Sequence, residues 1–83
     1  MTNKNEILSQ VEMIYRRILK NNELVLTAET TAHDVEGWDS LNHTILMTEV
    51  QKHFQIKFSL KEIIKFRNIG DMVNLLSEKL SAN

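Results

Sequence analysis

Apolar side chains recur every three or four residues along the first quarter of the chain, a spacing that places them on one face of an α-helix. Basic residues stand in the last turns of this segment, where cations favour a helix C-terminus. Asn21-Asn22 then ends the pattern. The pattern predicts a first helix from Glu6 to Lys20, with an apolar stripe made of Ile7, Leu8, Val11, Ile14, Tyr15, Ile18 and Leu19.

Three further helices are predicted in the second half of the chain. Leu46, Met47, Val50 and Phe54 form the inward face of a helix from about Ser40 to Phe54. Ser59 and Glu62 fit a capping box, which predicts a short helix over residues 60–66 that ends at Asn68-Ile-Gly-Asp71. A last helix follows, with Met72, Val73, Leu76 and Leu80 on one face. The fold class is therefore all-α, a small irregular four-helix bundle of three longer helices and one short one.

A long connection, residues 21–38, separates the first two predicted helices and shows no sustained period. Val25 and Leu26 are expected to hold it against the core, and a short helical turn can form within it. Connections longer than about 12–15 residues are uncommon in compact domains and are often functional. The connection leads directly into the stretch EGWDSLNH, residues 36–43.

Length and composition exclude several classes of protein. A chain of 83 residues forms one domain, which we expect to span residues 1–83 with a core of about 5–80. The chain has no cysteine for a disulfide, a thiolate metal site or a nucleophile, and no apolar run of about 20 residues that could span a membrane. A net charge of −1 argues against nucleic acid as a partner. We expect a cytoplasmic monomer, because one core accounts for the apolar residues and the N-terminus lacks the apolar segment of a signal peptide.

Asp39-Ser40-Leu41 opens the second predicted helix. Capping alone would explain it, because Asp and Ser are both favoured N-cap residues. The triplet is, however, preceded by Gly37-Trp38 at the end of the long connection, and Gly70-Asp71 opens the last helix. This arrangement, over about residues 5–80, resembles the acyl carrier protein family and its peptidyl carrier relatives.

The resemblance implies that Ser40 carries a 4′-phosphopantetheine arm, which a phosphopantetheinyl transferase attaches from coenzyme A with magnesium. Asp39 is then a residue that assists this modification. The protein would hold acyl intermediates as thioesters for acyl-loading and acyl-using enzymes, without catalysis of its own. The arm would bring the thiol that the polypeptide lacks.

Three other functions are compatible with parts of the sequence. The first is a carrier-like helical module that is never modified and binds a partner through its second helix. The second is a hydrolase with a Ser40–His43 pair, which lacks a visible group to orient the histidine. The third is a metal site from His33, Asp34, His43 and His53, whose spacing matches no compact metal motif, so no metal ligand is assigned. Met13, Met47 and Met72 are interpreted as core filling, with an acyl-chain cleft as the alternative.

Charge distinguishes this chain from the primary carrier proteins of fatty-acid synthesis. In the family that the chain resembles, those carriers are strongly acidic along the second helix. Residues 1–40 hold seven acidic and four basic side chains, whereas residues 41–83 hold four acidic and six basic ones. Glu49 is the only acid of the second helix. Because charge complementarity sets partner choice, we expect a carrier dedicated to polyketide, nonribosomal-peptide or glycoconjugate biosynthesis. The predicted partner surface comprises Trp38, Leu41, Ile45, Thr48, Lys52, Lys61 and Lys65.

Overall fold

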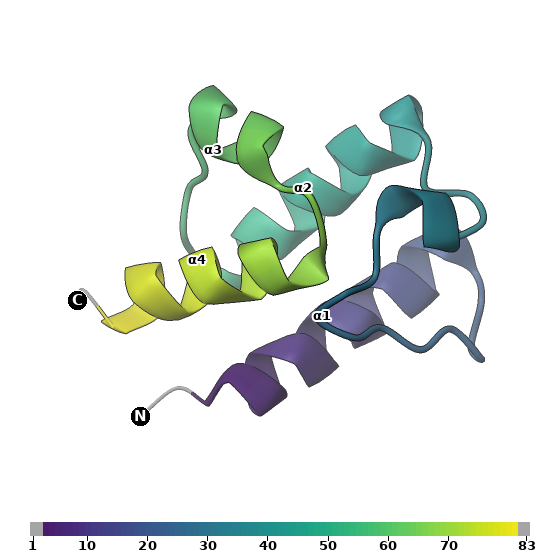
Figure 1. Cartoon of the computed structure of the whole chain (residues 1–83), viewed down its shortest axis with the longest axis horizontal. Coiled ribbons are helices and arrows are strands. Elements are labelled where there is room, and N and C mark those ends of the chain that lie inside the picture. Colours follow the sequence, from purple (N-terminus) through teal and green to yellow (C-terminus); the bar gives the residue numbers. More distant parts are fainter. Residues whose placement is uncertain (1–2, 82–83) are drawn as a thin grey trace.

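The computed structural model describes residues 3–81 and contains four α-helices and no strand within that range (Figure 1). The helices are α1 (Lys4–Leu19), α2 (Ser40–Phe54), α3 (Leu60–Lys65) and α4 (Ile69–Ser81). A 3₁₀ turn at Ala32–Asp34 lies inside the long connection, as expected. The predicted all-α class is confirmed, with three longer helices and one short one. None of these helices has the length and apolar character needed to cross a membrane.

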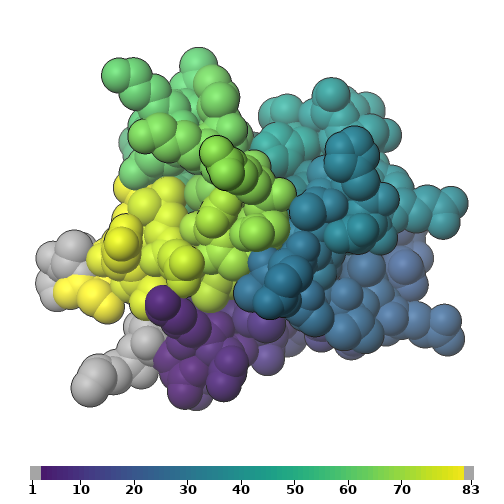
Figure 2. All heavy atoms as spheres, in the orientation of Figure 1, coloured from purple at the N-terminus to yellow at the C-terminus, as the bar shows by residue number. Residues whose placement is uncertain are grey.

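The core lies where α1 contacts both α2 and α4. On the face of the molecule seen in Figure 2, the beginning of α1 lies beside α4. Met47 and Met72 are buried, as predicted for core filling, but Met13 is 64% exposed and that prediction is wrong. Met13 stands two residues after Val11, which places it on the far side of α1 from the apolar stripe. The buried residues of the three long helices are Ile7, Val11, Ile14, Tyr15, Leu46, Met47, Val50, Ile69, Met72, Val73 and Leu76.

The helix ends follow local capping chemistry. The Asn3 side chain accepts a hydrogen bond from the Asn5 amide at 2.7 Å, so α1 begins two residues earlier than predicted. The capping box of α3 is present, because Ser59 Oγ accepts from the Glu62 amide at 3.1 Å and Glu62 Oε1 from the Ser59 amide at 2.8 Å. Asn68 Oδ1 accepts from the Asp71 amide at 2.9 Å. Asn68 thus caps α4, and Ile69-Gly-Asp71 forms its first turn rather than a separate break between helices.

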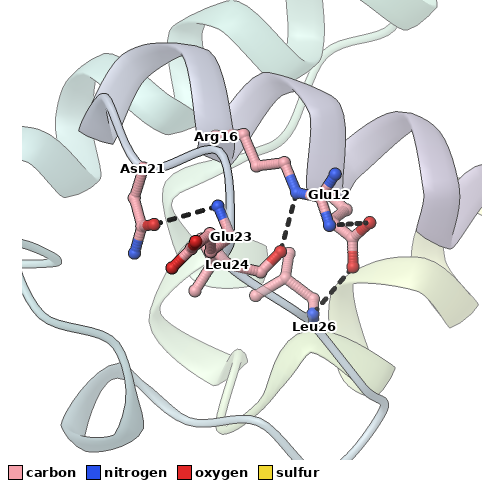
Figure 3. A network of polar contacts seen from close by, with 6 residues as sticks. All are labelled: Glu12, Arg16, Asn21, Glu23, Leu24 and Leu26. Atoms are coloured by element: carbon pink, nitrogen blue, oxygen red, sulfur yellow. Dashed lines mark hydrogen bonds and ion pairs between the residues drawn. The ribbon is translucent and has the colours of Figure 1, made fainter.

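Polar contacts attach the first part of the long connection to α1 (Figure 3). Arg16 Nε donates to the Leu24 carbonyl at 2.7 Å, and Glu12 Oε2 accepts from the Leu26 amide at 2.9 Å. Glu12 and Arg16 also form an ion pair at 3.2 Å. Leu26 is buried, as expected, but Val25 is 66% exposed and does not hold the loop. Both residues lie outside regular structure, and of these two neighbours only Leu26 faces the core.

The middle of the connection is attached to the first turn of α4. The amide of Ile69 donates to the Thr30 carbonyl at 2.9 Å, and the amide of Gly70 donates to the Ala28 carbonyl at 2.8 Å. These two amides are among the first in α4, which have no partner inside the helix. The loop carbonyls satisfy them, so α4 helps to fix the path of the chain toward α2.

Candidate functional site

The candidate site is the N-terminus of α2, where Asp39 is the N-cap. Its Oδ1 accepts from the Asn42 amide at 2.8 Å, while its extended backbone brings the chain into the helix. The sequence left open whether Asp39 or Ser40 caps the helix, and the structure assigns this role to Asp39. Ser40 is therefore the first helical residue.

Ser40 is exposed, and its hydroxyl is not used in capping. Within the described residues, the amides of Ser40 and Leu41 donate to no protein acceptor, while the Asn42 amide is held by Asp39. Free amides and the positive end of the helix dipole favour an anion at this position. An exposed hydroxyl beside these amides fits a phosphodiester, so the residues present suit a phosphate-linked group.

The turn before Ser40 depends on Gly37. This residue has φ +90°, a left-handed conformation that a side chain disfavours. Its carbonyl accepts from the Asp39 amide at 3.0 Å and from Asn42 Nδ2 at 2.7 Å. The turn and the first turn of α2 are consequently joined on both sides of Ser40.

Trp38 is half-buried and lies edge-on to Tyr15 of α1, with ring centroids 5.0 Å apart and an interplanar angle of 86°. Its indole Nε1 donates to His43 Nδ1 at 2.9 Å. The hydroxyl of Tyr15 is buried with no hydrogen-bond partner among the described residues, and burial raises the pKa of this hydroxyl well above its ordinary value. The indole thus joins α1 to α2 immediately before the cap.

The two other chemical hypotheses receive no support from the geometry. His43 uses Nδ1 to accept from Trp38, and no hydrogen bond joins it to Ser40. Burial lowers the pKa of His43. Within residues 3–81, no three His, Asp or Glu side chains gather in a group that could hold a metal ion.

The predicted partner residues lie on the outer faces of α2 and α3 and on the turn before them. Leu41 is 73% exposed and Ile45 is 40% exposed, while Trp38 is only partly accessible. The sequence interpretation missed two large apolar side chains of α3, Leu60 and Ile64, which are both exposed. The shortness of α3 could have indicated their exposure, because a helix of six residues can bury only one narrow face. The remaining predicted residues, all exposed, are Thr48, Lys52, Lys61 and Lys65.

Both acids on α2 and α3 are engaged in contacts within the protein. Glu49 pairs with Arg17 of α1 at 3.3 Å. Glu62 belongs to the capping box and pairs with Lys79 of α4 at 3.2 Å. The hydrogen bond from the Ser59 amide, followed by that from Lys79, lowers the pKa of Glu62. The outer surface of these two helices is therefore basic and apolar rather than acidic.

Comparison with known proteins identifies the family. Residues 9–76 match the family described as the phosphopantetheine attachment site. The solution NMR structure of a holo acyl carrier protein from Geobacter metallireducens superposes with a TM-score of 0.86. It is 38% identical to this chain, and the match covers 92% of this chain and 87% of that one. No curated protein matches.

The chain belongs to the acyl carrier protein family, as the residue pattern predicted. It is a carrier rather than an enzyme, and its prosthetic group is 4′-phosphopantetheine. Acyl-handling enzymes are its general class of partner.

Proposed function

We propose that Ser40 is the residue to which 4′-phosphopantetheine is attached. The observation that carries the proposal is the exposed hydroxyl of Ser40 at the first position of α2, within the segment that matches the family. The amides of Ser40 and Leu41, which have no acceptor among residues 3–81, favour the phosphate of the linkage. When bound, the group supplies a thiol for carrying acyl chains, which a chain without cysteine cannot supply itself.

Asp39 assists the modification in this proposal, and a phosphopantetheinyl transferase that uses magnesium carries it out. One carboxylate oxygen of Asp39 accepts from the Asn42 amide. Its other oxygen accepts no hydrogen bond from the described residues and faces no competing cation there. Asp39 therefore can cap α2 and contact the transferase at the same time.

The carrier serves a specialised pathway, of the polyketide, nonribosomal-peptide or glycoconjugate type. Support comes from the surface that an enzyme would meet beside Ser40. Leu41 and Ile45 present apolar area there, Lys52, Lys61 and Lys65 are exposed, and the acids Glu49 and Glu62 are engaged by cations of α1 and α4. Because potentials across an interface tend to be complementary, the partner enzymes present an apolar site with an acidic rim. A single domain over residues 1–83, working as a cytoplasmic monomer, remains a prediction.

The attachment is tested by intact mass after incubation with coenzyme A, magnesium and a broad-specificity transferase. The wild type should gain one phosphopantetheine group, and Ser40→Ala should gain none. Ser9→Ala, which removes an exposed serine of α1, is the matched control and should be modified normally. If the folded wild type gains no mass with several transferases, the unmodified interaction module becomes the better hypothesis.

The docking surface is tested by charge reversal on α3. Holo protein carrying Lys61→Glu and Lys65→Glu should be accepted better than the wild type by enzymes of fatty-acid synthesis, which bind carriers with an acidic surface. Lys4→Glu combined with Lys20→Glu, at the two ends of α1 and outside the proposed surface, changes the net charge by the same amount and is the control. Equal gains in the control and in the α3 variant would mean that overall charge, and not this surface, sets the preference.

A further inference from the structure

The hydrogen bond between Trp38 and His43 spans the residue proposed for modification. Indole Nε1 and imidazole Nδ1 are 2.9 Å apart, and the two rings lie nearly parallel, with centroids 6.0 Å apart and an interplanar angle of 19°. Trp38 precedes Asp39-Ser40 by one position, and His43 lies one helical turn beyond Ser40. The pair therefore bridges the turn and the helix on either side of Ser40.

The direction of this hydrogen bond fixes the chemical state of His43. An indole nitrogen can only donate, so Nδ1 must accept with its lone pair. The imidazole is then neutral and carries its hydrogen on Nε2. With Nδ1 accepting from the indole and Nε2 carrying the hydrogen, neither ring nitrogen is free to act as a base toward Ser40.

Trp38 transmits this contact to the backbone that leads to Ser40. Its ring packs edge-on against Tyr15 of α1, and its amide donates to the Val35 carbonyl at 3.3 Å. The next residue is the N-cap Asp39, whose backbone carbonyl accepts from the His43 amide at 2.8 Å. Fixing the indole in place thus fixes the residues between it and the first turn of α2.

We infer that His43 is a positioning residue for the modification of Ser40, acting through its hydrogen bond with Trp38. The inference rests on the proposed attachment at Ser40. A transferase must meet the serine hydroxyl in one geometry, and small displacements of a reacting group cost rate. Loss of one neutral hydrogen bond corresponds to about a fivefold change in an equilibrium. We therefore expect removal of this bond to lower kcat/KM for modification about fivefold.

Three variants separate positioning from bulk structure. His43→Leu keeps an apolar side chain of similar size but removes the acceptor. His43→Asn keeps an acceptor, Oδ1, near the position of Nδ1, and should restore most of the rate. Trp38→Phe keeps a ring against Tyr15 but removes the donor, so it should slow modification as much as His43→Leu does.

The double variant completes the test. If the two residues act through one bond, adding His43→Leu to Trp38→Phe should produce no further loss of kcat/KM. Additive losses would overturn the inference. Melting temperatures of all variants show whether a slow variant is simply unfolded, and rates are compared only where the protein is folded.

The single tryptophan of the chain gives an independent signal, because its indole N–H produces one resolved NMR resonance. This resonance should move in His43→Leu and stay close to its wild-type position in His43→Asn. An unmoved resonance in His43→Leu, or wild-type kcat/KM in that variant, would refute the positioning role. A wild type that is not modified at all instead refutes the attachment at Ser40, so the two failures are distinguishable.

Discussion

Gly70 is the position at which the structure allows the sharpest prediction about stability. Its amide donates to the Ala28 carbonyl at 2.8 Å, while a Cβ added to it would lie 2.9 Å from that oxygen and 3.1 Å from the Ala28 Cβ. In proteins, a Cβ atom essentially never lies closer than 3.0 Å to a heavy atom outside its own neighbourhood, so the loop that carries Ala28 must move. Alanine would push away the carbonyl to which its own amide is bonded.

The magnitude follows from opposing effects of Gly70→Ala. Overpacking typically costs about 1–3 kcal/mol. Alanine in place of glycine within a helix recovers at most about 1 kcal/mol, and less in the first turn. The net loss in the free energy of unfolding should be about 1–2 kcal/mol, which corresponds to a melting temperature lower by about 5–10 °C in a domain of this size.

Urea unfolding followed by circular dichroism measures the loss directly. Asn74→Ala is the matched control, because Asn74 is exposed on the same helix and alanine there has the better helix propensity. This control should be as stable as the wild type or slightly more stable. If Gly70→Ala is as stable as Asn74→Ala, the loop carbonyl moves without cost and the packing argument is wrong.

Three further predictions concern the neighbourhood of Ser40. Tyr15→Phe removes a buried hydroxyl that has no partner among the described residues, so the free energy of unfolding should rise by about 1 kcal/mol; a clear loss in urea unfolding would contradict this. Gly37→Ala places a side chain at φ +90° and should cost about 1–2 kcal/mol in the same assay. Burial lowers the pKa of His43 below its ordinary value of 6.5, so the unfolded chain binds this proton more readily. Stability should fall as the pH drops through 6.5 and stop falling below the folded-state pKa. When urea unfolding is measured at several pH values, the free energy of unfolding of His43→Asn should depend less on pH than that of the wild type.

The helices could be predicted because their signals are local. Apolar spacing identified α1, α2 and α4, and the Ser59–Glu62 capping box identified α3. The same chemistry placed Asp39 and Ser40 at the mouth of α2. Boundaries shifted where a cap lay outside the apolar pattern, as at Asn3 and Asn68, since an apolar period contains no information about polar end groups.

The errors at Met13 and Val25 have a different origin. Both side chains are apolar and both are exposed. An apolar side chain is not required to be buried, and the direction of its Cα–Cβ bond decides whether it faces the core or the solvent. The hydrogen bonds of Trp38 and Gly70 were also beyond prediction. Each joins the long connection to a helix, and no periodic pattern specifies which backbone carbonyl or imidazole nitrogen will lie opposite.

The long connection is attached at intervals to each of the three long helices. Glu12 and Arg16 hold its beginning on α1, Gly70 holds its middle on α4, and the indole of Trp38 holds its end on α2. A domain this small buries little surface, so it can keep a long loop ordered only if the loop's polar groups find partners. The position of Ser40 thus depends on α1 and α4 as well as on the helix that it begins. Loosening a distant attachment, as Gly70→Ala does, should for this reason lower the stability of the fold and slow modification of Ser40 together.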